Sequence, residues 1–316
     1  MRIVRAGARA PGAGLGAAVA IGNFDGIHRG HRAVLDAARA LARELAAPFG
    51  VITFEPHPRE VLHPDRAPAR LTPLRRKIEL FRDLGVEVLH ILRFDAPLMQ
   101  LGPDAFVAEV LVGRLGIRAL AAGQDFRFGH RRGGDMDLMA RLGREHGFRV
   151  RAVPRVEAEG ADCSSTRIRT ALEDGEVGLA ARLLGYAYAV DGIVRPGDRR
   201  GRTLGFPTAN VDPLGRSPLL PAKGVYAVKA GLREPQGMTS RPAVANFGHR
   251  PTVDGTKLLL EVHLLEGGGD LYGRRMQVAF LERLRGERKF AGLDELKAQI
   301  ARDSAEARAI HGLVPA

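Results

Sequence analysis

The sequence contains no tryptophan, and its aromatic residues make up only 5% of the chain. Basic residues number 48, but 42 of them are arginine, and there is no basic tail or lysine-rich run. Proteins that bind RNA on a small barrel typically use exposed aromatic side chains among clustered lysines. The scarcity of both features argues against RNA binding, which is the alternative from a different functional class, and we expect no nucleic-acid partner.

Cysteine and long apolar runs are also scarce. Cys163 is the single cysteine, which excludes an intramolecular disulfide and a cysteine-based zinc site. We expect it to be a small buried side chain. No run is apolar enough to span a membrane, and residues 1–15 alternate arginine with small residues, unlike a secretory signal. These absences predict a cytoplasmic protein without a membrane partner.

Positive charge prevails, with a formal net charge of +12. The surplus is even, because residues 1–185 hold 28 basic and 22 acidic side chains and residues 186–316 hold 20 and 14. Polyanionic small substrates explain such a diffuse surplus as well as a macromolecular partner does. The 316 residues suffice for two domains.

From residue 19 to residue 184, short apolar runs alternate with segments of helical periodicity. This order predicts an α/β domain with a parallel sheet, which binds its ligand at the carboxyl ends of the strands. The expected strands are 19–24, 49–54, 86–94, 119–123 and 148–156, and the expected helices are 30–47, 73–84, 103–115 and 135–146.

Beyond residue 185 the pattern changes to short strands broken by glycine and proline, which predicts an antiparallel barrel. We therefore expect two domains, 1–185 and 186–316. The chain ends in an expected helix that would pack on the barrel through Leu293, Leu296, Ile300, Ala307 and Ile310. The expected barrel strands are 189–194, 225–228, 243–247, 258–264 and 276–281.

The segment Ile21–His31 reads IGNFDGIHRGH and joins the end of an expected strand to the start of an expected helix. Backbone N–H groups in a first helical turn lack intrahelical partners, and the helix dipole favours an anion there. His28 and His31 could hydrogen-bond a triphosphate, and glycines leave the backbone accessible. An isolated histidine pair would more often lie on the surface, but adenylyl transfer needs this kind of contact with the leaving pyrophosphate.

A second phosphate site is indicated at Ser164–Arg169, where three hydroxyl residues precede Arg167 and Arg169. The hydroxyl groups can cap a helix, and the guanidinium groups can pair with phosphate. A capping box alone would explain the hydroxyl residues but not the two arginines.

Between Gly192 and Asn210 the chain reads GIVRPGDRRGRTLGFPTAN, a glycine-rich loop whose amides can wrap phosphates. Thr208 and Asn210 alternate on an extended segment, so both side-chain oxygens would face one side and could bind Mg²⁺ that bridges to ATP. The structural alternative is an ordinary barrel hairpin with threonine and asparagine as turn residues.

Several segments resemble known enzymes. The motif GNFDGIHRGH is similar to the signature of the HxGH nucleotidylyltransferase superfamily, and TFEPHPRE (53–60), GQDFRFG (123–129) and SSTRIR (164–169) narrow the resemblance to the bacterial FAD synthetases. The segments PTAN (207–210), GVYA (224–227), NFGHRPT (246–252) and LEVH (260–263) resemble the riboflavin kinase signature. The resemblance extends over nearly the whole chain.

The resemblance implies a bifunctional riboflavin kinase/FMN adenylyltransferase with a Rossmann-like first domain. The barrel would convert riboflavin and ATP to FMN and ADP, and the first domain would convert FMN and ATP to FAD and pyrophosphate, both with Mg²⁺. In the first domain it implies catalysis by His28 and His31 and ATP contacts at Gly22, Asn23, Phe24, Asp25, Gly26, His28, His31, Asp125, Ser164, Ser165, Thr166, Arg167 and Arg169.

For the kinase, the resemblance places the general base at Glu261, which without it would more often be a solvated strand residue. It implies Thr208 and Asn210 as metal ligands. Flavin contacts are expected at His57, Arg250 and Arg285, although His57 could equally belong to a rigid turn between Pro56 and Pro58. The expected ATP contacts are Gly192, Gly201, Arg202, Gly205, Pro207, Thr208 and Asn210.

Two further alternatives are an adenylyltransferase for another phosphorylated acceptor, with a regulatory barrel, and a flavin sensor with decayed sites. The PTAN and LEVH segments argue against the first, and the presence of every key position argues against the second.

Overall fold

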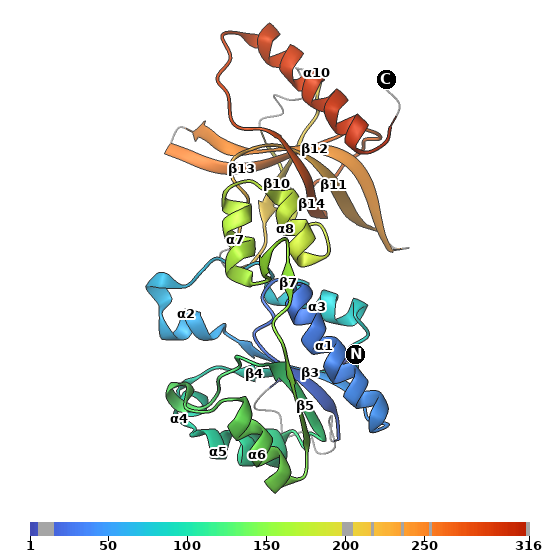
Figure 1. Cartoon of the computed structure of the whole chain (residues 1–316). Coiled ribbons are helices and arrows are strands. Elements are labelled where there is room, and N and C mark those ends of the chain that lie inside the picture. The colour runs from blue at the N-terminus through green and yellow to red at the C-terminus, as the bar shows by residue number, and fades with distance from the viewer. Residues whose placement is uncertain (6–15, 198–204, 216–217, 235–236, 253–254, 314–316) are drawn as a thin grey trace. The chain divides into compact units, whose positions relative to one another are not determined.

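A computed structural model describes residues 1–5, 16–197, 205–215, 218–234, 237–252 and 255–313, and within 233–234, 249–252 and 255–258 it describes the backbone alone. The chain forms two compact units, Met1–Ser165 and Thr166–Ala316 (Figure 1). This division falls inside the Ser164–Arg169 segment, and the boundary expected between residues 185 and 186 stays a prediction. None of the helices in these ranges is long and apolar enough to cross a bilayer.

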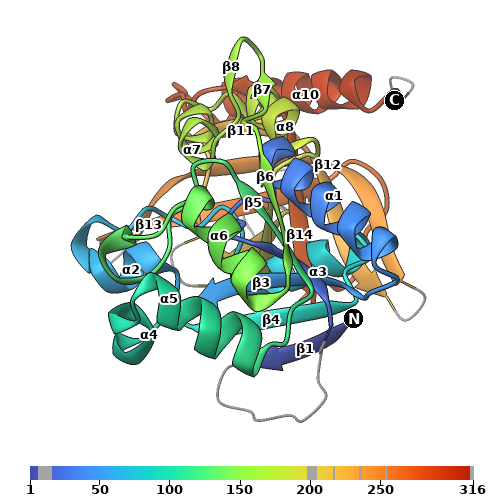
Figure 2. The same ribbon diagram turned by 60° about the horizontal axis from the view of Figure 1, so that its bottom comes forward.

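The first unit is built on a six-stranded sheet with the order β1-β4-β3-β2-β5-β6. All neighbouring strands are parallel, which confirms the expected α/β domain. Figure 2 shows β1, β4 and β3 side by side. The strands are β1 (Arg2–Arg5), β2 (Ala18–Ile21), β3 (Phe49–Glu55), β4 (Val88–Arg93), β5 (Ala119–Gly123) and β6 (Arg149–Val153).

Helices cover both faces of this sheet. On one face, α1 (Arg29–Glu44) packs on the central strands through the apolar stripe Val34, Leu35, Ala38 and Leu41. On the other face, the π-helical segment η2 (Phe106–Arg114), which follows the short helix α5 (Pro103–Ala105), and α6 (Met136–His146) contribute to a core with Val19, Ile52 and Leu120. η2 replaces most of the helix expected over 103–115, and Leu115 N donates to the carbonyl of Val110, five residues back.

The remaining elements of this unit are short, apart from one helix. They are α2 (Pro58–Leu62), η1 (Pro64–Arg66), α3 (Leu74–Asp83), α4 (Ala96–Gln100), η3 (His130–Arg132), β7 (Glu157–Ala158) and β8 (Ala161–Asp162). The strand β2 lies between β3 and β5, so the chain order reverses at its carboxyl end. Ligands of open α/β sheets bind at such a reversal, and the segment with the two histidines begins there.

The second unit is a closed antiparallel barrel with the order β10-β13-β12-β11-β14-β9, as expected. It closes because β10 pairs with both β13 and β9. Thr208 directly precedes β10, and Asn210 lies on that strand. The strands are β9 (Ala189–Arg195), β10 (Ala209–Pro213), β11 (Gly224–Glu234), β12 (Gly237–Thr252), β13 (Gly255–Leu264) and β14 (Arg275–Arg285).

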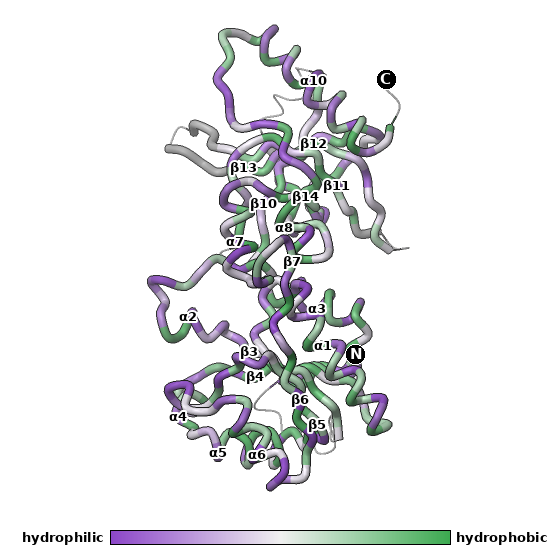
Figure 3. The backbone as a smooth tube through the Cα atoms, viewed as in Figure 1, coloured by the Kyte–Doolittle hydropathy of each residue, from purple (hydrophilic) through white to green (hydrophobic). Residues whose placement is uncertain are grey.

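Helices α7 (Ser165–Glu173) and α8 (Val177–Leu184) precede the barrel, and α10 (Leu293–Ile310) follows it. Figure 3 shows hydrophilic and hydrophobic residues alternating along α10, which packs on β11, β12 and β14. Ala307 is buried in this contact. The expected apolar stripe is wrong at Leu293, which is 65% exposed, because α10 contacts the barrel through its later turns.

Candidate active sites

The loop between β2 and α1 has an uncommon backbone, with positive φ at Phe24 (+50°), Gly26 (+94°) and Ile27 (+38°). Residues other than glycine adopt such angles at a cost in free energy. Phe24 and Ile27 are buried, with exposed fractions of 1% and 0%, so packing holds the loop. The loop leads to His28, the N-cap of α1, whose Nδ1 accepts a hydrogen bond from the backbone N of His31 at 3.3 Å.

His28 and His31 lie against each other, with ring centroids 3.7 Å apart and ring planes inclined by 20°. Burial, together with the nearby His28 and Lys77, lowers the pKa of His31 well below its usual value, so this ring is neutral at neutral pH. Its Nδ1 is buried without a partner among the described residues. Both histidines lie at the start of α1, where the helix dipole and free backbone N–H groups favour phosphate binding. Cys163 is buried as expected, with its Sγ 3.7 Å from Nδ1 of His28.

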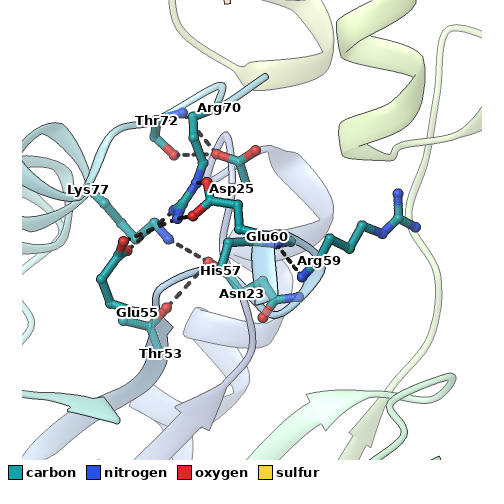
Figure 4. A network of polar contacts seen from close by, with 10 residues as sticks. All are labelled: Asn23, Asp25, Thr53, Glu55, His57, Arg59, Glu60, Arg70, Thr72 and Lys77. Carbon is teal, nitrogen blue, oxygen red and sulfur yellow. Dashed lines mark hydrogen bonds and ion pairs between the residues drawn. The ribbon is translucent and has the colours of Figure 1, made fainter. Parts of the chain in front are cut away.

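The carboxylate of Asp25 is bound by the protein itself. Its Oδ1 accepts hydrogen bonds from N and Oγ1 of Thr72 at 2.9 and 3.1 Å (Figure 4), and its Oδ2 accepts one from N of Leu71 at 3.2 Å. Thr72 Oγ1 also accepts a hydrogen bond from N of Gly26 at 2.9 Å. These contacts hold the loop, and an ATP contact of Asp25 stays a prediction.

Two buried cations beside this loop were missed by the sequence reasoning. Lys77 on α3 is 0% exposed, and its Nζ donates to the carbonyl of Asn23 at 2.7 Å (Figure 4). Burial lowers the pKa of Lys77 to about 8. Arg70 is 5% exposed and pairs with Glu55 and Glu60. No local pattern in the sequence points to them, because Lys77 binds a backbone carbonyl and Arg70 binds carboxylates elsewhere in the chain.

His57 is buried and is the N-cap of α2, where its Nδ1 accepts a hydrogen bond from N of Arg59 at 3.1 Å. Burial lowers the pKa of His57 to about 4, although the nearby Asp25 carboxylate acts in the opposite direction. The ring is therefore neutral and helps to form the turn that we considered as the alternative. Its contact with a flavin stays a prediction.

The second phosphate segment lies at a helix start, as expected. α7 begins at Ser165, whose Oγ donates to the carbonyl of Asp25 at 2.7 Å. The structure thus brings Ser165, within the first unit, into contact with the loop of the two histidines. Of the other residues in the segment, Thr166 is exposed, whereas Ser164, Arg167 and Arg169 are half-buried.

Asp125 follows β5 and is exposed, with its Oδ2 3.3 Å from Nη2 of Arg155. Nη1 of Arg155 also donates to Oδ2 of Asp162 at 2.7 Å. The position of Asp125 just after a strand's carboxyl end agrees with a nucleotide contact. The carboxylate of Asp125 is, however, paired with Arg155 within the protein.

Partly buried apolar side chains lie at or beyond the carboxyl ends of three strands. They pack against the core without being covered by it, and they are Phe54, Leu98, Leu101 and Phe126. Phe126 stacks on Phe128, a core residue, with centroids 6.0 Å apart and planes inclined by 12°. Half-exposed aromatic and aliphatic side chains can pack against a flat aromatic ligand.

In the barrel, Asn210 on β10 lies opposite Glu261 on β13, and Glu261 lies opposite Asn246 on β12. Residues directly opposite each other on antiparallel strands lie on the same face. Oδ1 of Asn210 is buried and has no hydrogen-bond partner within the described ranges. A buried acceptor of this kind is uncommon unless a ligand, ion or water satisfies it.

Glycine makes room for Asn210. A Cβ on Gly197 would lie 1.7 Å from Nδ2 of Asn210, and a Cβ on Gly192 would lie 2.3 Å from Cγ1 of Val211. The amide of Asn210 can thus occupy its position only if residue 197 has no side chain.

The structure leaves other expected kinase residues at the surface or outside its range. Gly205, Pro207 and Thr208 are exposed just before β10. Gly201 and Arg202 lie outside the described residues, and for Arg250 on β12 only the backbone is described.

Arg285, an expected flavin contact, forms an ion pair with Asp303 on α10. Its Nη2 lies 2.8 Å from Oδ2 of Asp303, and its Nε lies 3.1 Å from both carboxylate oxygens. Asp303 is 3% exposed and also accepts a hydrogen bond from Gln299 at 2.7 Å. Arg285 thus connects β14 to α10, and a direct flavin contact stays a prediction.

Comparison with known proteins assigns both units. The FAD synthetase family model matches residues 13–167, and the riboflavin kinase family model matches residues 184–311. The bifunctional riboflavin kinase/FMN adenylyltransferases of Escherichia coli K12 and Pseudomonas fluorescens are 47% and 45% identical, over 94% and 93% of both chains. The Bacillus subtilis enzyme of the same name is 40% identical, over 92% of this chain and 90% of its own.

Among solved structures, a crystal structure described as a macrolide-efflux protein from Streptococcus pneumoniae is similar to this one, with a TM-score of 0.86 and 32% identity. It covers 98% of this chain and 99% of its own. The riboflavin kinase match covers the barrel, whereas an adenylyltransferase with a regulatory barrel predicts no such match. The chain therefore belongs to the bifunctional riboflavin kinase/FMN adenylyltransferase family, in which its second part converts riboflavin to FMN and its first part converts FMN to FAD.

Proposed function

We propose that His28 and His31 hold the triphosphate of ATP during adenylylation of FMN. The observation that supports this is the stacked pair on the first turn of α1, where Nδ1 of His31 is buried and unpartnered among the described residues. An FMN phosphate oxygen attacks the α-phosphorus, the bond to the bridging oxygen breaks, and pyrophosphate leaves. Neutral His31 donates a hydrogen bond to the phosphoryl oxygens as their charge develops.

We assign the rest of ATP to residues 22–26, Asp125 and the Ser164–Arg169 segment. The hydrogen bond from Ser165 to the backbone of Asp25 supports a shared site. We assign FMN to His57 and to the half-exposed apolar side chains Phe54, Leu98, Leu101 and Phe126.

For the kinase, we propose Thr208 and Asn210 as Mg²⁺ ligands and Glu261 as the general base. The buried, unpartnered Oδ1 of Asn210 fits a hard cation that prefers oxygen ligands. Bound Mg²⁺ would offset the negative charge of the ATP phosphates. Glu261, opposite Asn210, accepts the proton of the ribityl hydroxyl as that oxygen attacks the γ-phosphorus and ADP leaves.

The remaining kinase assignments follow from the sequence motifs. Gly192, Gly201, Arg202, Gly205 and Pro207 would contact ATP, and Arg250 and Arg285 would contact or enclose the flavin. We also propose a cytoplasmic enzyme whose partners are small molecules, without nucleic acid or membrane. The riboflavin kinase match begins at residue 184, which supports a domain boundary near residues 185 and 186.

One experiment tests these assignments. The protein is incubated with riboflavin, ATP and Mg²⁺, and the flavins are separated by chromatography. Replacing His28 and His31 by alanine should stop FAD formation while FMN accumulates. Replacing Glu261 or Asn210 should abolish FMN formation but leave added FMN convertible to FAD. Loss of both activities in either variant would contradict two separate sites.

A further inference from the structure

Residues Arg70, Leu71 and Thr72 form a short segment, called here the 70–72 clasp, that contacts both proposed substrate segments of the first unit. On one side the clasp binds Asp25, in the loop of the two histidines. On the other side it binds Glu55 and Glu60. In the sequence, Glu55 precedes His57 and Glu60 follows it. Figure 4 shows both carboxylates next to Arg70.

The contacts on the flavin side come from one guanidinium group. Nη2 of Arg70 lies 2.7 Å from Oε2 of Glu60 and 3.1 Å from Oε1 of Glu55, and Nη1 lies 3.3 Å from Oε2 of Glu55. Nε of Arg70 also donates to Glu60. Since Glu55 ends β3 and Glu60 lies on α2, Arg70 fixes the turn that contains His57 at both of its ends.

The contacts on the ATP side come from the next two residues. The N–H groups of Leu71 and Thr72 and the hydroxyl of Thr72 all donate to Asp25, which is 2% exposed. The Thr72 hydroxyl also accepts from N of Gly26, two residues before His28. Arg70 and Thr72 are separated by a single residue, so a displacement of one side of the clasp is transmitted to the other.

We propose that the 70–72 clasp couples binding of FMN to binding of ATP, with Arg70 as the positioning residue on the flavin side. This rests on the proposed assignment of the two histidines to ATP and of the His57 turn to FMN. A ligand that shifts one side of the clasp shifts the other side as well, so binding at one side changes the free energy of binding at the other. The coupling is reciprocal, so each substrate increases the affinity for the other by the same factor, at least about 5-fold.

The test uses initial rates of FAD formation by the full chain over a grid of FMN and ATP concentrations. The interaction factor is the ratio by which saturating ATP lowers the KM for FMN. We expect Arg70→Met to bring this factor close to one and to raise the KM for FMN at saturating ATP about 5-fold or more. FAD formation at saturating FMN and ATP should be retained, which shows that the first unit is folded, and riboflavin kinase activity of the same preparation should be unchanged.

Arg151→Met is the matched control, because Arg151 forms an exposed ion pair with Glu44 in the same unit. It should keep the wild-type interaction factor. The proposal is overturned if Arg70→Met keeps that factor, if the wild type itself shows a factor of one, or if the Arg151 variant loses coupling equally.

If Arg70→Met fails to fold, Glu60→Gln decides, because it removes one charged partner of Arg70 and keeps the side-chain shape. A wild-type factor in that variant overturns the proposal. The His28→Ala variant separates the two levels of inference. FAD formation by His28→Ala at the wild-type rate would refute the site assignment, whereas a strongly slowed His28→Ala enzyme with an Arg70 variant of wild-type coupling would refute the clasp alone.

Discussion

Nδ1 of His28 accepts a hydrogen bond from the backbone N of His31, 3.3 Å away, so the first histidine caps the helix on which the second one lies. His28 thus has a structural role as well as the proposed catalytic one, and substitutions can separate them. Asparagine caps helices well, whereas alanine does not. We expect His28→Asn to keep the stability of the first unit but to slow FAD formation by about 10²–10³-fold, the usual effect of losing one transition-state hydrogen-bond donor.

His28→Ala is the control for this prediction. It should lose the same activity and, in addition, about 1 kcal/mol of stability, because the cap is lost as well. The measurements are the rate of FAD formation from added FMN and the midpoint of urea unfolding. If His28→Asn were as active as the wild type, the imidazole of His28 would serve only as a cap.

Acid should destabilise the first unit. Burial lowers the pKa of His57 and His90 to about 4 and lowers that of His31 well below its usual value. In the unfolded chain each of these rings titrates near about 6.5. Below that pH the unfolded chain binds more protons than the folded one, so the free energy of unfolding decreases as the pH falls from about 6.5 toward 4. Thermal unfolding followed by calorimetry at several pH values checks this.

His90 on β4 provides a specific variant, since both of its ring nitrogens are buried without a hydrogen-bond partner in the described part of the chain. We expect His90→Leu to raise the stability of the first unit by about 1–3 kcal/mol at pH 7, and by more at pH 5. His146→Leu, at an exposed position on α6, should change little. A His90→Leu variant that is less stable than the wild type at both pH values would contradict this account.

In the kinase unit we expect Gly197→Ala to abolish riboflavin phosphorylation, since its Cβ would lie 1.7 Å from Nδ2 of Asn210 and would displace that amide. FAD formation from added FMN should be unaffected. Gly178→Ala on α8 is the matched control, because its Cβ would meet only the Arg182 side chain, 3.6 Å away. Full kinase activity in the Gly197 variant would exclude Asn210 from the site.

Glu261→Gln should lower the kcat of the kinase by about 10²–10⁴-fold, the usual contribution of a general base. The KM for ATP should change little, because the amide keeps the shape of the side chain. Glu282→Gln, an exposed position on β14, serves as the control and should retain activity. A steady-state kinase assay distinguishes the two, and equal activity would refute the role of Glu261.

The ion pair between Arg285 and Asp303 predicts that these residues act together. Asp303→Asn should lower the stability of the second unit by about 1–3 kcal/mol, because it removes the charge of a buried carboxylate that holds a half-buried guanidinium. If Arg285 acts by holding α10, Asp303→Asn and Arg285→Met should raise the KM for riboflavin by similar factors, and the double variant should add no more. A larger effect of Arg285→Met alone would instead support direct flavin contact.

The histidine pair could be predicted from the sequence because strand end, loop and helix start lie within one short segment. Arg70 and Lys77 could not, since their partners are distant: Lys77 contacts Asn23, 54 residues away, and Arg70 contacts carboxylates 10 and 15 residues away. A lysine on an amphipathic helix normally lies in solvent. Here Lys77 is buried instead, because its Nζ donates a hydrogen bond to the carbonyl of Asn23 in the bent loop.

The fold was predictable wherever apolar periodicity reports burial. The prediction failed at β1, where Arg2 and Arg5 are exposed. This segment is a strand only because it pairs with β4. The prediction also failed at Leu293, an apolar residue at the start of a helix that meets the barrel only further along. In both cases the structure depends on a contact with another part of the chain, which the local sequence pattern cannot indicate.

Closure of the barrel has a consequence for its dynamics. Each of its six strands is paired on both sides, so no strand can peel away from an edge. Amide protons in the middle of these strands should exchange with solvent only through a collective opening. In the first unit, by contrast, β1 and β6 are edge strands, and exchange there should begin at β1 by local fraying.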